Sequence, residues 1–168
     1  MNESKNPKDF QHAGRQDRLL HERVHDPYKS KSKLPEPTIC PDCGALYHNG
    51  RWQWGEKPKG AHETLCPACH RIHDKIPAGF LTLRGEFFAA HKEEILGLVH
   101  QTEEKAKKEH PIERIIDSEA QEEGVLLITF TDAHLARGVG EAIHHAFKGE
   151  LDFHYNEEDV TLRVNWKR

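Results

Sequence analysis

Two Cys-x-x-Cys pairs constrain this chain more than any other feature, because they contain all four of its cysteines. The first pair is Cys40 and Cys43, and the second is Cys66 and Cys69, with 22 residues between the pairs. A Cys-x-x-Cys turn presents two thiolates from one tight knuckle, and two knuckles can surround a zinc ion tetrahedrally. The spacing therefore predicts one zinc ion in a four-cysteine ribbon.

The residues beside the cysteines suit such knuckles. Gly44 readily takes the positive φ that the first turn needs, and Pro41 and Pro67 stiffen both turns. A site with four protein ligands is closed, so we expect the ion to hold structure and not to activate water. Nearby histidines could replace a ligand, although solvent-facing positions are the simpler expectation for them: His48, His62, His70 and His73.

Two other uses of the thiols remain open, a redox-active pair and two structural disulfides. A redox Cys-x-x-Cys is expected beside a βαβ pattern, which neither pair has. The chain opens with polar residues and no apolar signal core, which points to a reducing cytoplasm. That compartment favours metal binding over disulfides.

The N-terminal half of the chain is mildly basic, and the C-terminal half is acidic. The net charge is −4, with +2 on residues 1–37, +2 on residues 38–84 and −8 on residues 85–168. A pI near 6.4 argues against a protein that coats nucleic acid by charge alone, so any RNA contact would be local. No run reaches the roughly 18 apolar residues of a membrane span, so we expect no membrane partner.

We expect an α+β protein in four parts. Residues 1–37 form a flexible basic arm, in which only Gln16–Val24 suits a short helix, and residues 38–84 form the zinc ribbon. The basic and histidine side chains of the arm suit phosphate contacts, and the alternative is a solvated tail. Residues 85–110 and 111–168 form a connecting helix and a small sheet domain.

Residues 45–54 predict a β-hairpin inside the ribbon, because an Asn-Gly pair at its centre is the preferred two-residue loop. This loop places Tyr47 opposite Trp52, and His48 opposite Arg51. One face of the hairpin is then polar, and the other is aromatic. The aromatic face carries Tyr47, Trp52 and Trp54.

This hairpin and its basic neighbours predict a contact surface. Unpaired bases stack on aromatic side chains, and lysine and arginine bind phosphates. The alternative is that so small a module uses its aromatic residues as its only core. The predicted RNA- or partner-binding residues are Tyr47, Arg51, Trp52, Trp54, Lys57, Lys59 and Arg71.

Residues 86–109 have the periodicity of one helix, with Phe88, Ile95 and Val99 on one face. Pro111 ends the pattern. We expect this helix to connect the ribbon with the C-terminal domain, so that its length sets their separation.

Residues 112–168 predict a ββαββ unit with a four-stranded, largely antiparallel sheet and one helix packed on a face. The strands lie near residues 113–119, 125–131, 151–155 and 160–166. Asp132 suits the N-cap of the helix, and Gly149 suits its end. The helix stripe and the Trp166 face of the sheet are expected to meet; the stripe consists of Ala136, Val139, Ile143 and Phe147.

No phosphate-binding loop, HExxH motif, nucleophile elbow or dinucleotide fingerprint occurs, so we expect no enzyme and no nucleotide cofactor. Asp132 and His134 lie at a strand-to-helix junction, where a metal-dependent hydrolase or a second metal site is conceivable. A helix cap with a nearby surface histidine is the simpler interpretation.

The motif Cys-Pro-x-Cys-Gly at residues 40–44, followed by Cys-Pro-x-Cys-x-Arg-Ile at residues 66–72, resembles the zinc-ribbon region of the large-ribosomal-subunit nuclear export adaptor family. It is also similar to small bacterial zinc-ribbon proteins. The resemblance covers about residues 38–110 and implies ribosome or ribosomal-RNA association, with the four cysteines as zinc ligands. That family has more Cys-x-x-Cys pairs and long later domains, so nuclear export does not transfer.

Together these features predict a cytoplasmic, non-enzymatic zinc-ribbon protein, bacterial by its resemblance, that binds structured RNA or the ribosome. The acidic C-terminal domain would dock a protein partner or keep the chain from wrong RNA sites. The rival is a protein-interaction adaptor that uses the ribbon, and a less favoured rival is the hydrolase at Asp132 and His134.

Overall fold

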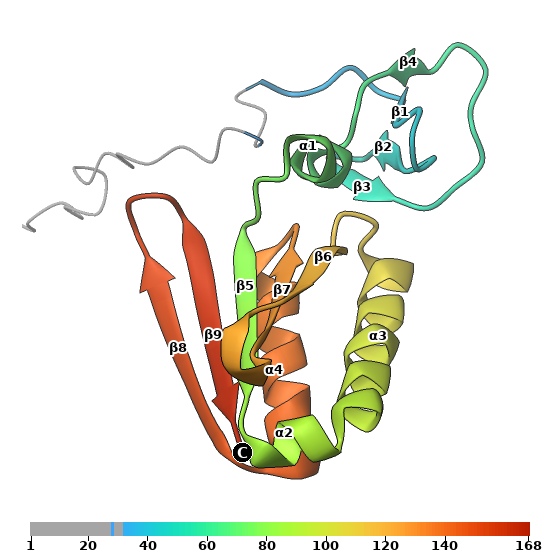
Figure 1. Ribbon diagram of the computed structural model, residues 1–168. Coiled ribbons are helices and arrows are strands. Elements are labelled where there is room, and N and C mark those ends of the chain that lie inside the picture. Colours follow the sequence, from blue (N-terminus) through green and yellow to red (C-terminus); the bar gives the residue numbers. More distant parts are fainter. Residues whose placement is uncertain (1–27, 29–31) are drawn as a thin grey trace, which may run out of the picture.

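The computed structural model describes Tyr28 and residues 32–168, which form two α+β units, each with a mixed sheet (Figure 1). Most of the predicted arm, including the expected helix at Gln16–Val24, lies outside the described residues. Within the described part of the chain, no helix combines the length and apolarity that crossing a bilayer requires.

The smaller unit is a four-stranded sheet followed by one helix. Its strand order is β3-β2-β1-β4, with β1 antiparallel to β2 and parallel to β4. The elements are β1 (Thr38–Ile39), β2 (Leu46–His48), β3 (Arg51–Gln53), β4 (His62–Glu63) and α1 (Pro67–Asp74).

The β2–β3 hairpin has the predicted register. Tyr47 lies opposite Trp52, and His48 opposite Arg51. Asn49 and Gly50 both have positive φ, as the tight loop requires. The carboxylate of Glu36 accepts hydrogen bonds from both of their backbone N–H groups at 3.0 Å. These bonds outweigh the effect of desolvation and lower the pKa of Glu36, so the carboxylate stays ionised and holds the turn.

The larger unit has a five-stranded sheet in the order β6-β7-β5-β9-β8. All of its neighbouring strands are antiparallel except β5 and β9, which are parallel. Its elements are β5 (Gly79–Arg84), α2 (Glu86–Ala90), α3 (Lys92–Glu109), β6 (Ile115–Ala120), a 3₁₀ turn (Glu122–Gly124), β7 (Leu126–Phe130), α4 (Ala133–Phe147), β8 (Glu150–Asn156) and β9 (Thr161–Lys167).

The predicted four-stranded ββαββ sheet was wrong by one strand. We expected residues 79–84 to end the zinc ribbon, whereas they form β5, the middle strand of the larger sheet. Its partners, β7 and β9, come much later in the chain, so the local pattern does not reveal them. Gly79 allows the close packing of β5 on α4, because a Cβ atom there would lie 2.6 Å from Ala136 Cβ.

The predicted connecting helix is two helices that belong to the larger core. The helical conformation is interrupted at His91, between α2 and α3. Helix α3 packs against α4. Phe88, Ile95 and Val99 are buried as their spacing predicts. Because α3 covers the sheet domain along its length, it does not act as a spacer between the units.

Helix α4 has the predicted start and the predicted buried stripe. Asp132 is its N-cap, with the carboxylate accepting from His134 N at 2.7 Å and Leu135 N at 3.2 Å. The stripe meets Trp166, which is fully buried and donates from Nε1 to Lys148 O at 2.7 Å. The core of the larger unit is therefore built around this helix.

Candidate metal centre

The four cysteines lie in the turn after the first strand and at the start of the helix of the smaller unit. Cys40 follows β1, and Cys43 lies in the turn before β2. Gly44 closes this knuckle with φ of 77° and donates to Cys40 O at 2.9 Å, as predicted from its place after the motif. Cys66 is the N-cap of α1, and its sulfur accepts from Cys69 N at 3.4 Å. The two knuckles are therefore held by backbone hydrogen bonds.

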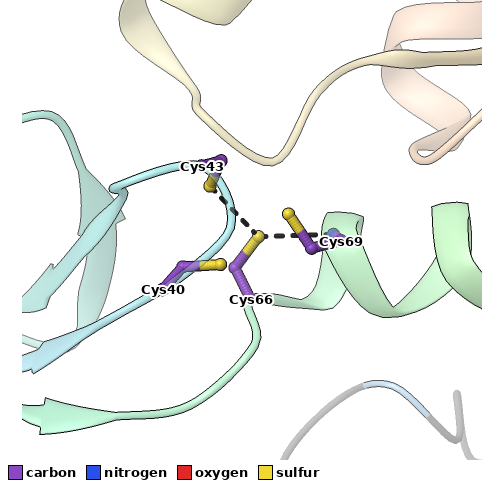
Figure 2. A group of neighbouring side chains, drawn as sticks. All are labelled: Cys40, Cys43, Cys66 and Cys69. Carbon is purple, nitrogen blue, oxygen red and sulfur yellow. Dashed lines mark hydrogen bonds between the residues drawn. The ribbon is translucent and has the colours of Figure 1, made fainter.

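The four sulfur atoms converge on a common centre (Figure 2). All of them lie within 4.8 Å of one another, and the Cys43 and Cys66 sulfurs are 3.7 Å apart. Zinc–sulfur bonds of about 2.3 Å in a tetrahedron place sulfurs about 3.8 Å apart. Disulfide sulfurs lie at about 2.05 Å, so the thiols are free. The cluster can hold one metal ion, and zinc fits its ligands and spacing.

The pKa values of the clustered thiols are shifted in different directions. Burial raises the pKa of Cys66 far above its usual range, and the neighbouring sulfur charges raise it further. Burial also raises the pKa of Cys69 to about 11, although Arg114 opposes the change. At Cys40, backbone hydrogen bonds outweigh burial and lower the pKa to about 7. A divalent cation among the sulfurs would favour four thiolates by its own charge.

Arg114 of the larger unit reaches this cluster. Its Nη2 atom donates to Cys69 Sγ at 3.0 Å and to Cys66 Sγ at 3.5 Å. Burial lowers the pKa of the guanidinium, but the hydrogen bond and charge of Cys69 outweigh it and leave the pKa raised. Four thiolates around a zinc ion carry two negative charges in excess, so one fixed arginine neutralises half of that excess.

The backbone around Arg114 is anchored in the larger sheet. Arg114 N donates to Thr131 Oγ1 at 2.8 Å, and Thr131 N donates back to Arg114 O at 2.9 Å. Arg114 Nε is buried and has no hydrogen-bond partner among the described residues, so the guanidinium has given up part of its solvation to reach the sulfurs. The larger unit therefore supplies a fixed cation to the centre.

Two further contacts join the units at the same place. Ile112 packs against the cysteine cluster. Trp54 Nε1 donates to Lys107 O, near the end of α3, at 2.7 Å. The cysteine cluster thus belongs to the ribbon and faces the larger unit, and residues from both units form its surroundings.

The predicted contact surface is divided between exposed and packed residues. Arg51 and Lys59 are exposed, and Lys57 is exposed with its Nζ atom 3.0 Å from Glu63 Oε1. Most of the aromatic residues of this surface pack against other side chains of the ribbon. Tyr47 and Trp52 are half-buried in an edge contact at 5.4 Å, and Trp52 packs against the cysteine cluster.

Trp54 and Arg71 are also committed to contacts within the chain. Trp54 keeps 39 % of its surface exposed while its ring nitrogen bonds to α3. Arg71 is buried, donates from Nη1 to Ile76 O at 3.0 Å, and lies over the ring of Tyr28 at 4.5 Å. Arg71 therefore holds the end of α1 and the segment before β1.

No histidine enters the cluster, since the only group of metal-ligand side chains found in the described part of the chain is the four cysteines. His73 instead lies 2.6 Å from Asp42 Oδ2, across the two knuckles. His134 is exposed, and the Asp132 carboxylate is occupied as a helix cap. The arrangement at Asp132 is the predicted cap, and it adds no ligand group.

The sequence interpretation missed Arg114 and Ile112. They lie just before β6, and 45 residues separate Arg114 from Cys69. No spacing rule connects an arginine at that distance with a Cys-x-x-Cys pair. Only the docking of the two units brings it to the sulfurs.

Comparisons of this chain with known protein families, with curated proteins and with solved structures found no match.

Proposed function

We propose that this chain is a non-enzymatic zinc-ribbon protein that binds structured RNA, including that of the ribosome, through the exposed basic side of its ribbon. A closed four-cysteine centre leaves no position for substrate on the metal, so the ion acts by holding structure. What remains for function is the outer surface of the ribbon.

The observation that carries this proposal is the exposure of basic side chains on the ribbon. Arg51, at the tip of the β2–β3 hairpin, and Lys59, in the following loop, are both exposed. The four cysteines fix the two segments that carry them. Residues 38–78, which form the ribbon, have five Lys/Arg against four Asp/Glu, whereas residues 79–168 have eleven against eighteen. The ribbon is therefore the less acidic end of the molecule even with a four-thiolate zinc site, and anionic RNA would approach that end.

The packing of the aromatic residues narrows the proposed surface. Trp52 supports the cysteine cluster, and only part of Trp54 remains accessible for a base. Phosphate contacts by arginine and lysine therefore contribute more than stacking. Such contacts weaken steeply as salt rises.

The test is co-sedimentation of the full chain with ribosomes, together with binding to purified ribosomal RNA, over a series of salt concentrations. Arg51→Glu with Lys59→Glu should abolish binding. The control, Lys92→Glu with Lys105→Glu, changes the net charge by the same amount at exposed positions of α3 and should leave most of the RNA binding. Equal losses in both double variants, or no loss in either, would contradict this surface.

The second candidate is a protein-interaction adaptor, which the engagement of Trp52 and Trp54 within the chain favours. An adaptor would bind a polypeptide with weak dependence on salt and would survive nuclease treatment of the lysate. Binding that nuclease removes supports RNA.

A further inference from the structure

Strand β8 is the outermost strand on one side of the larger sheet (Figure 1). Leu162 N donates to Ala78 O, so this residue of β9 directs its backbone groups toward β5. Because these directions alternate along a strand, the neighbouring residues of β9 direct theirs toward β8. Their partners in the β8–β9 register are Glu150, Asp152, His154 and Asn156.

The alternate residues of β8 consequently direct their N–H and C=O groups outward. These residues are Leu151, Phe153 and Tyr155, and the described part of the chain offers their backbone groups no hydrogen-bond partner. Phe153 and Tyr155 also keep 38 % and 51 % of their surfaces exposed. An unpaired backbone row with apolar side chains is a template for another strand.

The opposite edge of the same sheet is protected in a way that β8 is not. Both edge strands carry two acidic residues, but only β6 has a register irregularity, which lies between Ile115 and Asp117. A bulge of this kind prevents pairing between edges. Strand β8 has seven residues in unbroken register, with no proline and no lysine. The difference marks β8 as the edge that can pair.

We propose that β8 pairs with β8 of a second copy of this chain, antiparallel about a twofold axis at Phe153, so that two five-stranded sheets become one. In this register Phe153 of one copy lies opposite Phe153 of the other copy, and Leu151 lies opposite the partner's Tyr155. All of these residues direct their backbone groups outward, so the pairing satisfies both rows of N–H and C=O groups. The apolar side chains meet on one face.

The other face of β8 favours this register by pairing a carboxylate with a histidine, whose ring N–H can donate to it. With the axis at Phe153, Asp152 lies opposite the partner's His154, and the twofold axis repeats the pair. Sliding the strands by two residues places Asp152 opposite itself in one direction and His154 opposite itself in the other. Identical groups directly opposite each other are unfavourable, and neither shifted register pairs Asp152 with His154.

The ends of the strand extend this complementarity. Antiparallel pairing brings the turn that follows β8 in one copy to the residues that precede β8 in the other. The turn carries Glu157, Glu158 and Asp159, and Lys148 precedes β8. A basic residue therefore lies at the end where the acidic turn arrives.

One strand pair is a small interface, so the association is weak and reversible, with a dissociation constant in about the micromolar range. Sedimentation velocity of the full zinc-loaded chain at rising concentration should show a monomer–dimer equilibrium. His154→Asp alone brings two carboxylates together, and Asp152→Lys alone removes the carboxylate that His154 faces, so each should weaken dimerisation about tenfold.

An equimolar mixture of these two variants gives the decisive measurement. In the heterodimer, the lysine introduced into one copy would face the aspartate introduced into the other, and the second pair is the natural one, so dimerisation should return. Phe153→Lys should abolish it, because lysine protects an edge. Glu119→Lys on β6 is the matched control and should dimerise like the unchanged chain.

Circular dichroism of each variant confirms that it is folded before its association is measured. A chain that stays monomeric at every concentration overturns the proposal, and so does a monomeric chain whose β8 pairs with an added peptide strand. A mixture that associates no better than its separate components overturns the register. Loss of dimerisation in Glu119→Lys assigns the interface to β6 and overturns the proposal as well.

Discussion

The two units of this protein differ most in what fills their interiors. The ribbon is built around small buried residues, and the larger unit is built around fifteen buried apolar residues that include Trp166, Phe88 and Phe130. The ribbon core consists of Cys40, Ala45, Cys66, Ala68 and Cys69. Apolar burial alone cannot stabilise the ribbon, because so few large side chains leave water there. We therefore expect the ribbon to depend on metal and the larger unit to be stable without it.

The largest expected effect comes from removing a ligand. Cys66→Ser should abolish metal binding and unfold the ribbon while the larger sheet stays folded, because structural zinc contributes about 10 kcal/mol or more to folding in small modules. The background variant Trp166→Phe leaves Trp52 and Trp54 as the only tryptophans, so their fluorescence reports on the ribbon.

Zinc content and fluorescence should change in Cys66→Ser and stay normal in His62→Ser, which alters an exposed histidine of the same module. Chelation of the unchanged chain should reproduce the cysteine variant. A ribbon that keeps its fluorescence after chelation would show that apolar packing is sufficient and would remove the contrast between the units.

The next effect tests the larger core by itself. Trp166→Ala removes a fully buried ring and its bond to Lys148 O, and it should lower the free energy of unfolding of this unit by about 4 kcal/mol. Urea titration followed by circular dichroism measures the change. Ile76→Ala, at a residue with 48 % of its surface exposed, is the control and should lose far less. Release of zinc at the same urea concentration as the unfolding of the sheet, shifted together with it in Trp166→Ala, would contradict independent cores.

A smaller effect tests the link between the units. Arg114→Gln removes the cation beside the thiolates and should weaken zinc binding about 10- to 100-fold, as the loss of supporting residues around metal sites does. Competition with a coloured chelator measures the affinity. Arg114→Lys keeps the charge and should retain part of the zinc affinity, and Arg137→Gln, at an exposed position of α4, should retain all of that affinity. Equal affinities in every variant would mean that the ribbon binds zinc without help from the sheet.

The smallest effect concerns the cap of α4. Asp132→Ala should cost about 1 kcal/mol in the stability of the larger unit, and Asp132→Ser should recover most of it, because serine can accept from the same N–H groups. Zinc content should remain at one ion per chain in both variants. Loss of a second bound ion in Asp132→Ala would instead identify this carboxylate as a metal ligand.

Features that depend on near neighbours in the chain were predictable. The Asn-Gly loop set the hairpin register, Gly44 supplied the positive φ of the first knuckle, and Asp132 capped α4. Each of these depends on hydrogen bonds or dihedral angles within a few residues. The grouping of the four cysteines followed as well, because a metal site imposes its own geometry on Cys-x-x-Cys pairs.

Features that depend on distant partners were not predictable. The sequence of β5 does not reveal that β7 and β9 pair with it on its two sides. The sequence of α3 is compatible with a connecting helix, and only the structure shows that its apolar face packs in the core with α4. The aromatic face of the hairpin likewise could not be divided into core and surface before Trp54 was seen to bond to α3.

By itself, the sequence determined which four cysteines group together, the hairpin that lies between their two pairs and the amphipathic elements of the larger unit. Only the tertiary structure decided the order of the five strands, the burial of the aromatic residues and the approach of Arg114 to the sulfurs. The reason is physical: backbone turns and thiol spacing act over a few residues, whereas strand pairing and the docking of one unit on another satisfy groups that lie far apart along the chain.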